Sequence, residues 1–276
     1  MKFEIIPAHE VTLAEQAIIF TEAFAGYLAG SIPMDAESLA RFLSVQGVDL
    51  CYSRFVRAAG KLAGFGYINR TGNISRLAAM GVVPSARRAG AARYLLLHLL
   101  DEARNRRDNT MMLEVFEQNP GAHALYSSNG FREITRLFGW RRKEDVDLTD
   151  AAAGLIEEIS LLAASETPSA FDYPEIPWQI SRHAVLKLAA AQAFRIGDTA
   201  IVIGDARSLP IRVHAFFYSS GKIDEIRSGF AAILQRFAGS EFFAPAIFPE
   251  KFGEEIFQPL GFMREPLNQF LMRQDL

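Results

Sequence analysis

The sequence is poor in cysteine, in net charge and in long apolar stretches, and each shortage excludes a class of protein. Cys51 is the only cysteine among 276 residues, so no disulfide can form within the chain and a reducing compartment is expected. A formal net charge of −3 provides no overall positive field for nucleic acid. No apolar run reaches the roughly 18 residues of a membrane-spanning helix, and the first residues do not resemble a signal peptide. The sequence therefore predicts a cytoplasmic protein that binds neither nucleic acid nor membrane.

Metal-ligand patterns are missing as well. The histidines are scattered along the chain, at positions 9, 98, 123, 183 and 214, and no H-E-x-x-H pattern or cysteine cluster occurs. Cys51 has no neighbouring base in the sequence, so we expect a structural thiol and not a nucleophile. No metal site is predicted.

Hydrophobic periodicity predicts alternating strands and helices in the first half of the chain. Strands are expected over residues 3–7, 51–58, 61–69, 75–83, 110–116 and 135–142, and helices over residues 13–28, 34–45, 89–107 and 120–129. This order indicates an α/β fold in which helices flank a mixed sheet.

A short loop between an apolar strand and an amphipathic helix carries the strongest functional signal. Residues 87–92 have the form R-x-x-G-x-A, in which Gly90 and Ala92 leave room for a ligand to approach the backbone. Consecutive backbone N–H groups and the positive end of the helix dipole favour an anion there. Arg87, Arg88 and Arg93 add positive charge. The loop predicts a diphosphate ligand.

Residues 77–131 resemble the GNAT family of acetyl-CoA-dependent N-acetyltransferases. The family's pyrophosphate loop is written Q/R-x-x-G-x-G/A, and residues 119–126 resemble its N-x-x-A-x-x-L-Y segment, closed by Asn129, Gly130 and Phe131. The resemblance implies a mostly antiparallel GNAT sheet and direct attack of an acceptor amine on acetyl-CoA in a ternary complex. It implies cofactor contacts from the splayed strand, the loop and the following helix, namely Met80, Val82, Val83, Arg87, Arg88, Ala89, Gly90, Ala91, Ala92, Arg93, Asn119 and Tyr126.

Three of these residues have expected chemical roles. The phenol of Tyr126, with an ordinary pKa of about 10, can protonate a departing thiolate whose pKa is about 8.5. The resemblance places the backbone N–H of Val82 at the developing oxyanion. Asn119 is expected to bind the pantetheine arm or an ordered water, and its position before Pro120 also suits a helix cap.

The general base is less well defined by the sequence. Many GNAT enzymes carry a glutamate on the fourth strand, but residues 75–83 contain no carboxylate. Glu114, on the next strand, is the nearest substitute and could act through water, or it could be an exposed strand charge. An acceptor amine of low pKa would need no strong base.

The second half of the chain repeats the first in a weaker form. Polar residues 143–150 suggest a boundary between a catalytic domain over residues 1–145 and a second domain over residues 150–276. A helix over 222–237, a strand over 242–248, a short helix over 250–259 and a strand over 268–273 repeat the order of the first domain. Residues 260–262 match residues 129–131 in form, and the same offset aligns Phe257 with Tyr126.

This second GNAT-like domain is expected to be degenerate. Phe257 lacks the tyrosine hydroxyl, and Asp224 and Glu225 follow the loop where a diphosphate would need positive charge. We therefore expect it not to bind acetyl-CoA, and instead to shape the acceptor site or the surface of a homodimer.

The acceptor and the exact function stay open at this stage. Aromatic and apolar residues at the first two helices suit a partly apolar amine or simply form the core; they are Phe20, Phe24, Tyr27, Ser31, Ile32 and Met34. The aromatic segment 171–178 could border the same pocket. The leading prediction is acetyl transfer to a small-molecule or amino-acid-like amine. The alternatives are a CoA-sensing or scaffolding module and a transferase that uses aminoacyl-tRNA.

Overall fold

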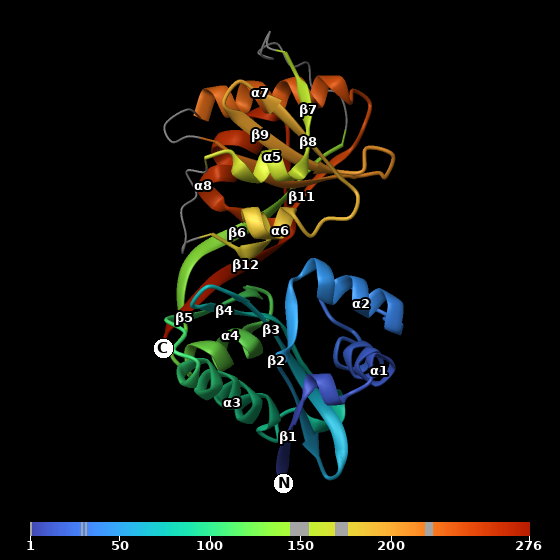
Figure 1. Cartoon of the computed structure of the whole chain (residues 1–276), viewed down its shortest axis with the longest axis vertical. Coiled ribbons are helices and arrows are strands. Elements are labelled where there is room, and N and C mark those ends of the chain that lie inside the picture. Colours follow the sequence, from blue (N-terminus) through green and yellow to red (C-terminus); the bar gives the residue numbers. More distant parts are fainter. Residues whose placement is uncertain (1, 29, 31, 144–154, 169–175, 219–222) are drawn as a thin grey trace. The chain divides into compact units, whose positions relative to one another are not determined.

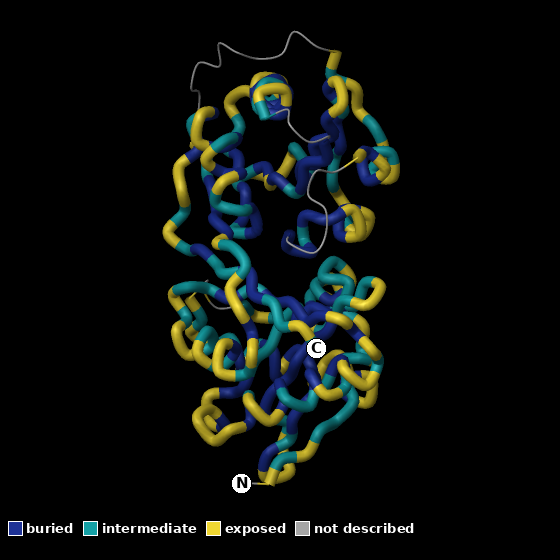
Figure 2. The backbone as a smooth tube through the Cα atoms, turned by 90° about the vertical axis from the view of Figure 1, so that its left-hand side faces the viewer, coloured by how far each residue is buried: buried dark blue, intermediate teal, exposed yellow. Residues whose placement is uncertain are grey.

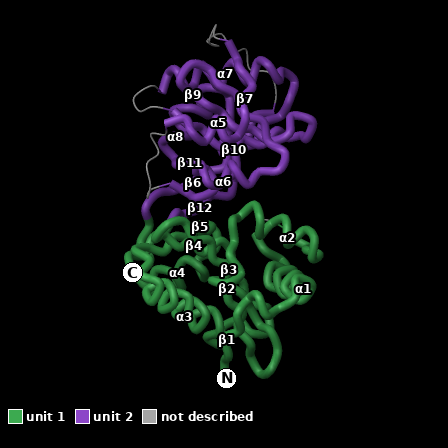
Figure 3. The backbone as a smooth tube through the Cα atoms, in the orientation of Figure 1, with its two compact units in different colours: residues 1–133, 272–276 green, residues 134–271 purple. Residues whose placement is uncertain are grey.

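The computed structural model describes residues 2–28, 30, 32–143, 155–168, 176–218 and 223–276. Several features expected from the sequence lie outside the described residues. They are Ser31, most of the domain boundary (144–150), most of the aromatic segment (171–175) and most of the loop before the second-half helix (219–222). The chain forms two compact units (Figure 3): Met1–Glu133 with Met272–Leu276, and Ile134–Leu271.

Unit 1 consists of a sheet covered by helices on both faces. Its strands β1 (Phe3–Pro7), β2 (Val48–Ala58), β3 (Lys61–Thr71), β4 (Ile74–Val82) and β5 (Thr110–Phe116) lie in that order, and the C-terminal strand β12 (Met263–Asp275) follows β5. Helices α1 (Leu13–Ala23) and α2 (Ala36–Val45) cover one face, and α3 (Ala91–Asn105) and α4 (Pro120–Ser127) the other (Figure 1). Pairing is antiparallel from β1 to β4 and parallel between β4 and β5, so the predicted mixed α/β sheet is confirmed.

Local sequence signals explain how α1 begins, and a glycine explains where it ends. Thr12 and Glu15 form a reciprocal capping box at its first turn. The helix ends at Ala23, earlier than the sequence suggested, and Gly26 follows with φ of +69°. Residues 24–28 therefore leave the helix and turn toward the sheet.

A bulge in β4 separates it from β5. The register pairs Ala79 with Tyr67 and Leu77 with Ile68, so Ala78 is an extra residue on the β4 side. Pairing of β4 with β5 runs from Ile74 and Thr110 only as far as Leu77 and Leu113. A bulge bends its strand, so β4 diverges from β5 beyond this point. The resemblance implied a splayed strand here, and the bulge gives its physical cause.

Buried strands form the centre of each unit, as the dark tubes in Figure 2 show. In unit 1 the aromatic residues Phe55, Phe65 and Tyr67 are fully buried, and Phe20 of α1 stacks on Phe65 with ring centroids 5.2 Å apart. Phe20 is therefore a core residue, which was one of the two alternatives for the aromatic residues of the first helix.

In unit 2 the strands of the sheet are ordered β12-β6-β11-β10-β9-β8-β7, as the continuation of one 12-stranded order. Its further elements are β6 (Arg132–Arg142), β7 (Glu157–Ile159), α5 (Leu161–Glu166), α6 (Arg182–Val185), β8 (Ala191–Ile196), β9 (Thr199–Gly204), β10 (Ile211–Phe217), α7 (Ile223–Arg236), β11 (Phe242–Pro249) and α8 (Glu250–Phe252). All six residues of β9 are buried, so both faces of this sheet are covered.

The two halves of the chain exchange strands. The sequence suggested that residues 135–142 close the first domain, but β6 pairs with β11, for example Arg142 with Phe242 and Trp140 with Ala244. In return the last five residues of the chain, Met272–Leu276, belong to unit 1. The division therefore falls at residues 133/134 and 271/272, because hydrogen-bonding partners and not chain position decide which unit a strand belongs to.

Unit 2 repeats the bulge and the divergence seen in unit 1. The parallel strands β10 and β11 pair only at Ile211 with Phe242 and at Arg212 with Phe243. The register between β10 and β9 passes from Val213 to Ala215 and skips His214. His214 thus occupies the position of Ala78, and helix α7 follows β10 as α3 follows β4. The internal repeat predicted from the sequence is present in the backbone.

Phenylalanine side chains fill the divergence of β10 and β11. Phe216 of β10 and Phe248 of β11 lie with ring centroids 6.1 Å apart, and Phe257 contacts them at 5.9 and 5.1 Å. Phe252 lies 5.6 Å from Phe257, and all four rings are buried. Phe257, which the repeat aligns with Tyr126, is thus part of a packed aromatic core.

We expect Phe257→Ala to lower the free energy of unfolding by about 3–5 kcal/mol, because it removes a fully buried ring and leaves a cavity. Urea unfolding followed by circular dichroism measures this loss. Ligand affinity in unit 1, titrated well below the unfolding transition, should stay within about twofold of the original value, a shift of less than about 0.5 kcal/mol. A large loss of affinity with little loss of stability would contradict a purely structural role for Phe257.

Candidate functional site

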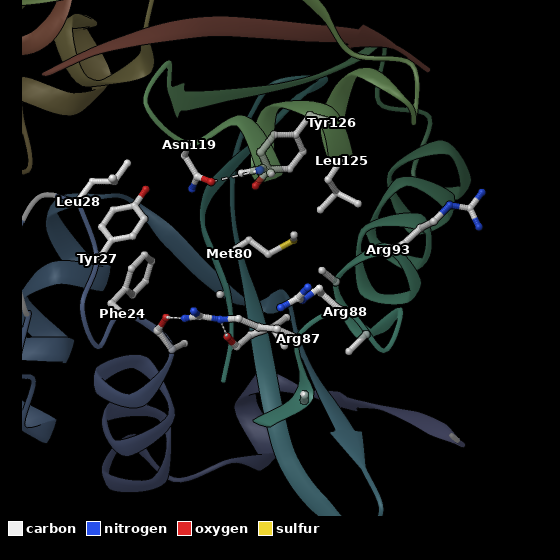
Figure 4. Close-up of a pocket in the computed structure, with 18 of the residues that line it drawn as sticks. Phe24, Tyr27, Leu28, Met80, Arg87, Arg88, Arg93, Asn119, Leu125 and Tyr126 are labelled. Atoms are coloured by element: carbon white, nitrogen blue, oxygen red, sulfur yellow. Dashed lines mark hydrogen bonds between the residues drawn. The ribbon is translucent and has the colours of Figure 1, made fainter. Parts of the chain in front are cut away.

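A cavity of about 570 Å³ lies in unit 1 at the divergence of β4 and β5. Its walls come from the segment after α1, the end of β4, the start of α3 and helix α4 (Figure 4). Ten of the residues predicted to bind cofactor line it, namely Met80, Val82, Arg87, Arg88, Gly90, Ala91, Ala92, Arg93, Asn119 and Tyr126. Val83 and Ala89 are neighbours of lining residues in the chain. The structure therefore brings the predicted residues together around one cavity.

The start of α3 presents free backbone donors to this cavity. Gly90 precedes the helix with φ of +92°, and Arg88 has φ of +58°. The first amide bonded within the helix is that of Tyr94, which donates to the Gly90 carbonyl at 3.0 Å. The amides of residues 91–93 precede it and point out of the helix end. This arrangement, with the helix dipole behind it, fits a phosphate group.

Glycine is favoured at position 90 by its backbone angle and not by lack of space. A Cβ atom at Gly90 would have Phe3 as its nearest neighbour, 3.9 Å away. The left-handed conformation is strained for most side chains, and asparagine and aspartate tolerate it best.

The three arginines of the loop differ in their surroundings. Arg87 donates from Nε to the Val82 carbonyl at 3.1 Å and from Nη2 to the Ala23 carbonyl at 2.9 Å. Figure 4 shows its guanidinium reaching to the end of α1, whereas the Arg88 guanidinium points toward the cavity and Arg93 extends from α3 in the opposite direction. The guanidinium of Arg87 is therefore bound to backbone carbonyl groups, and the charge of Arg88 faces the cavity.

The edge of β4 offers a backbone donor to the cavity. Val83 donates its N–H to the Ala63 carbonyl of the preceding strand segment at 2.9 Å. Alternate residues of a strand direct their backbone groups to opposite sides, so the N–H of Val82 points away from β3 and toward the divergence. This is the donor that the resemblance implied.

Asn119 and two tyrosines form the polar part of the opposite wall. Asn119 caps α4 by accepting a hydrogen bond from the Ala122 amide at 3.2 Å, which confirms the cap expected from the sequence. Tyr27 and Asn119 both line the cavity, and the Tyr27 ring lies 4.9 Å from Phe24 and 6.0 Å from Phe116 between centroids. This wall joins the segment after α1 to the start of α4.

Tyr126 is buried, with 7% of its surface exposed. Burial raises the pKa of its phenol above the ordinary value, and the nearby Tyr27 raises it further. Burial also raises the pKa of Tyr27, in part offset by the polar side chain of Asn119. Both phenols are therefore neutral hydrogen-bond donors at physiological pH.

Glu114 lies next to the divergence but is held in an ion pair. It follows Leu113, the last residue of β5 that pairs with β4. Arg76 donates to both of its carboxylate oxygens, from Nη2 at 2.7 Å and from Nε at 3.0 and 3.1 Å. The Arg76 and Glu114 side chains are 5% and 4% exposed, and neither residue lines the cavity. Glu114 is therefore not an exposed strand charge, which was the alternative to a role as base, and the role as base stays a prediction.

We expect Glu114→Gln to lower the free energy of unfolding by about 3 kcal/mol, because it removes the carboxylate that forms an ion pair with the buried Arg76. The double variant Arg76→Met with Glu114→Leu should regain most of this stability in urea unfolding. The double variant also tests the base: if it keeps its catalytic rate, Glu114 carries no essential proton transfer.

Sequence reasoning missed two features of the site. Gly81 was not singled out, although a glycine inside a strand indicates close approach of another element; its added Cβ would lie 2.9 Å from the Ala23 Cβ. The meeting of Tyr27 with Phe116 and Asn119 at one wall of the cavity had no signal in the sequence, because Tyr27 is distant from both along the chain.

The remaining candidates lie outside the cavity. His123 contacts Glu133 at 2.7 Å, and Cys51 is an exposed free thiol. Within the described ranges, no group of three histidine, cysteine or acidic side chains is placed to hold a metal ion. The described helices include none that is long and apolar enough to cross a membrane.

Comparison with known proteins agrees with this geometry. Residues 21–131 match the model of the Acetyltransferase (GNAT) family. The [ribosomal protein bS18]-alanine N-acetyltransferase of Escherichia coli K12 is 41% identical over 76 residues, which are 28% of this chain and 51% of that protein. The Salmonella typhimurium protein of the same name is 46% identical over 56 residues, 20% of this chain and 38% of that one. The chain thus spans about half the length, or less, of these curated relatives.

Solved structures match over nearly the whole chain. A tandem GNAT protein from the clavulanic acid biosynthesis pathway has a TM-score of 0.64 at 14% identity, covering 99% of this chain and 98% of that one. A GCN5-related N-acetyltransferase from Anabaena variabilis has a TM-score of 0.65 at 17% identity, covering 99% of this chain and 72% of that one. At such identities the likeness establishes the fold.

Proposed function

Since residues 21–131 belong to the Acetyltransferase (GNAT) family, we propose that unit 1 transfers the acetyl group of acetyl-CoA to the primary amine of a small-molecule or amino-acid-like acceptor. The observation that carries the proposal is one cavity that joins the anion-binding start of α3 to the free edge of β4 and to Tyr126.

The residues present fit the cofactor. The amides of residues 91–93, with Arg88 and Arg93 beside them, would hold the diphosphate. The β4 edge past Leu77 has backbone groups directed to the cavity, and these would pair with the amide groups of the pantetheine arm. Asn119 and Tyr126 would border the sulfur end.

Acetyl-CoA supplies an activated acetyl thioester when bound. The Val82 N–H would donate to the acetyl carbonyl oxygen, where negative charge develops during attack by an amine. The neutral phenol of Tyr126 would donate a hydrogen bond toward the sulfur and so stabilise the departing thiolate. Because its pKa is raised, Tyr126 keeps its proton at the pH values at which the acceptor amine loses its own.

The lining of the cavity favours a weakly basic amine. Its described residues include three arginines and no aspartate or glutamate, so the cavity offers no carboxylate to hold an ammonium ion. An α-amine, with pKa of about 8, reaches its neutral form more easily than a lysine side chain with pKa of about 10.4. The similarity to alanine N-acetyltransferases supports an amino-acid or peptide α-amine as the first acceptor to test.

The proposal is tested by titrating acetyl-CoA into the protein and then following acetylation by mass spectrometry. The acceptors are L-alaninamide, a hexapeptide beginning with alanine, and Nα-acetyl-lysine amide. We expect one acetyl-CoA bound per chain and faster acetylation of the two α-amines. Binding without acetylation of any of the three would favour the CoA-sensing alternative, which the engagement of Glu114 by Arg76 mildly supports. Absence of binding would contradict the proposal.

A further inference from the structure

We infer that Arg87 is a positioning residue that connects the diphosphate loop to the acceptor side of the cavity, and not a ligand of the diphosphate. The inference deepens the proposed function and rests on it, because it assigns one end of the cavity to acetyl-CoA and the other to the amine.

The first argument is the position of the two carbonyl groups that Arg87 binds. Ala23 is the last residue of α1, so its carbonyl has no partner within the helix and lies at the negative end of the helix dipole. Arg87 donates to it at 2.9 Å and also donates to the carbonyl of Val82, the last residue of β4, at 3.1 Å. One guanidinium therefore joins the ends of two elements that both border the cavity.

The second argument is the close approach of these two elements. A Cβ atom at Gly81 would lie 2.9 Å from the Ala23 Cβ and 3.1 Å from the Phe65 ring. Only glycine at this position lets α1 lie so near β4, and Arg87 spans the junction from the side. The glycine and the arginine thus fix the same contact by independent means.

The cavity wall formed by residues 24–28 begins directly after the contact between α1 and β4. Phe24 follows Ala23 directly, and the Tyr27 ring packs on Phe116 with centroids 6.0 Å apart; Phe24 and Tyr27 line the cavity together with Asn119. In the other direction Arg87 is three residues from Gly90. A diphosphate that orders the loop before α3 would thereby restrict the motion of Arg87, of the end of α1 and of the cavity wall at Tyr27 together. Binding of acetyl-CoA should then favour binding of the amine, and the coupling is reciprocal.

Two identical changes at neighbouring positions separate the roles. Arg87→Gln and Arg88→Gln each remove one positive charge. We expect Arg88→Gln to raise the Kd for acetyl-CoA about tenfold or more through loss of a charged contact, and to leave the KM for L-alaninamide within about threefold. We expect the reverse for Arg87→Gln, with the Kd for acetyl-CoA within about threefold and the KM for L-alaninamide raised about tenfold or more at nearly constant kcat.

Hydrogen–deuterium exchange provides a readout that needs no acceptor. The Phe24 and Tyr27 amides donate to the Phe20 and Phe24 carbonyls, both at 3.1 Å, so residues 24–28 have amides whose protection can be followed. Acetyl-CoA at a saturating concentration should slow amide exchange of residues 24–28 in the original protein and in Arg88→Gln. It should not slow exchange of these residues in Arg87→Gln.

The outcomes distinguish the inference from the proposed function. If the original protein fails to bind acetyl-CoA, the proposed function is wrong. If the original protein binds acetyl-CoA and acetylates the acceptor, but Arg87→Gln raises the Kd for acetyl-CoA as much as Arg88→Gln does, then Arg87 is a diphosphate ligand and the inference is overturned. Unchanged exchange of residues 24–28 on binding of acetyl-CoA to the original protein would equally overturn it.

Discussion

Gly90→Asp should raise the Kd for acetyl-CoA at least about 100-fold, a loss of about 2.7 kcal/mol. Gly90 lies at the start of α3, where the amides of residues 91–93 point into the cavity. An aspartate there places a carboxylate where the diphosphate would bind. Two such charges 4 Å apart repel by about 4 kcal/mol at an effective dielectric constant of 20.

Gly90→Asn is the matched control. Asparagine has nearly the shape of aspartate and also tolerates the φ of +92° at this position, but it carries no charge. We expect it to raise the Kd less than about tenfold, or about 1.4 kcal/mol, because the backbone donors are kept. Calorimetric titration of both variants, together with their melting temperatures, separates loss of charge complementarity from loss of fold.

Equal losses of affinity in the two variants would indicate that space or backbone strain, and not charge, is decisive at this position. Unaltered affinity in Gly90→Asp would place the diphosphate elsewhere. Either result would remove the main support for the assignment of the α3 start.

The sequence predicted the first half of the chain well because its signals are local. The bounds of β1 and β5 were both predicted correctly, since each is a short apolar run flanked by turn residues. The cap of α4 and the loop before α3 were also predicted from residue types that fit special backbone geometry. These elements depend on neighbours in the chain, which a sequence displays directly.

Features that depend on distant partners were not predictable in this way. The bulge at Ala78 is defined only by the pairing of β3 with β4, and an alanine in a strand does not by itself indicate a bulge. The exchange of β6 and β12 between the units likewise depends on which strands form hydrogen bonds with one another. The hydrogen bonds of Arg87 are of the same kind, because one of its partners, Ala23, lies far away in the sequence.

The two units show how one backbone plan can hold or lose a ligand site. Both have a bulge that separates two parallel strands, at Ala78 and at His214. In unit 1 the divergence borders a cavity lined by Gly81, Val82 and Tyr126. In unit 2 the corresponding strands carry Phe216 and Phe248, whose rings meet. Large aromatic side chains thus stabilise the second divergence by packing. The order of elements is therefore kept in the repeat, whereas the loop motif is not.

Tyr126→Phe should leave the Kd for acetyl-CoA within about twofold and lower kcat by about 10²–10⁴-fold, the usual contribution of a positioned acid. The ring of Tyr126 packs on Phe131, with centroids 5.8 Å apart, and phenylalanine keeps this contact. Only the hydroxyl is lost, and with it the donor that would stabilise the departing thiolate. Tyr94→Phe is the control, since Tyr94 is exposed and lies outside the lining of the cavity.

The pH dependence of the original protein provides an independent test of this role. Because the pKa of Tyr126 is raised above its ordinary value, the phenol stays protonated as the pH rises through 10. The rate should therefore increase as the acceptor amine loses its proton and then level off, with no fall from phenol ionisation up to about pH 10. A fall with an apparent pKa near 8 or 9 that Tyr126→Phe abolishes would show that the phenol ionises within the working range. Equal kcat in the original protein and Tyr126→Phe would remove Tyr126 from the mechanism, because no other change accompanies loss of the hydroxyl.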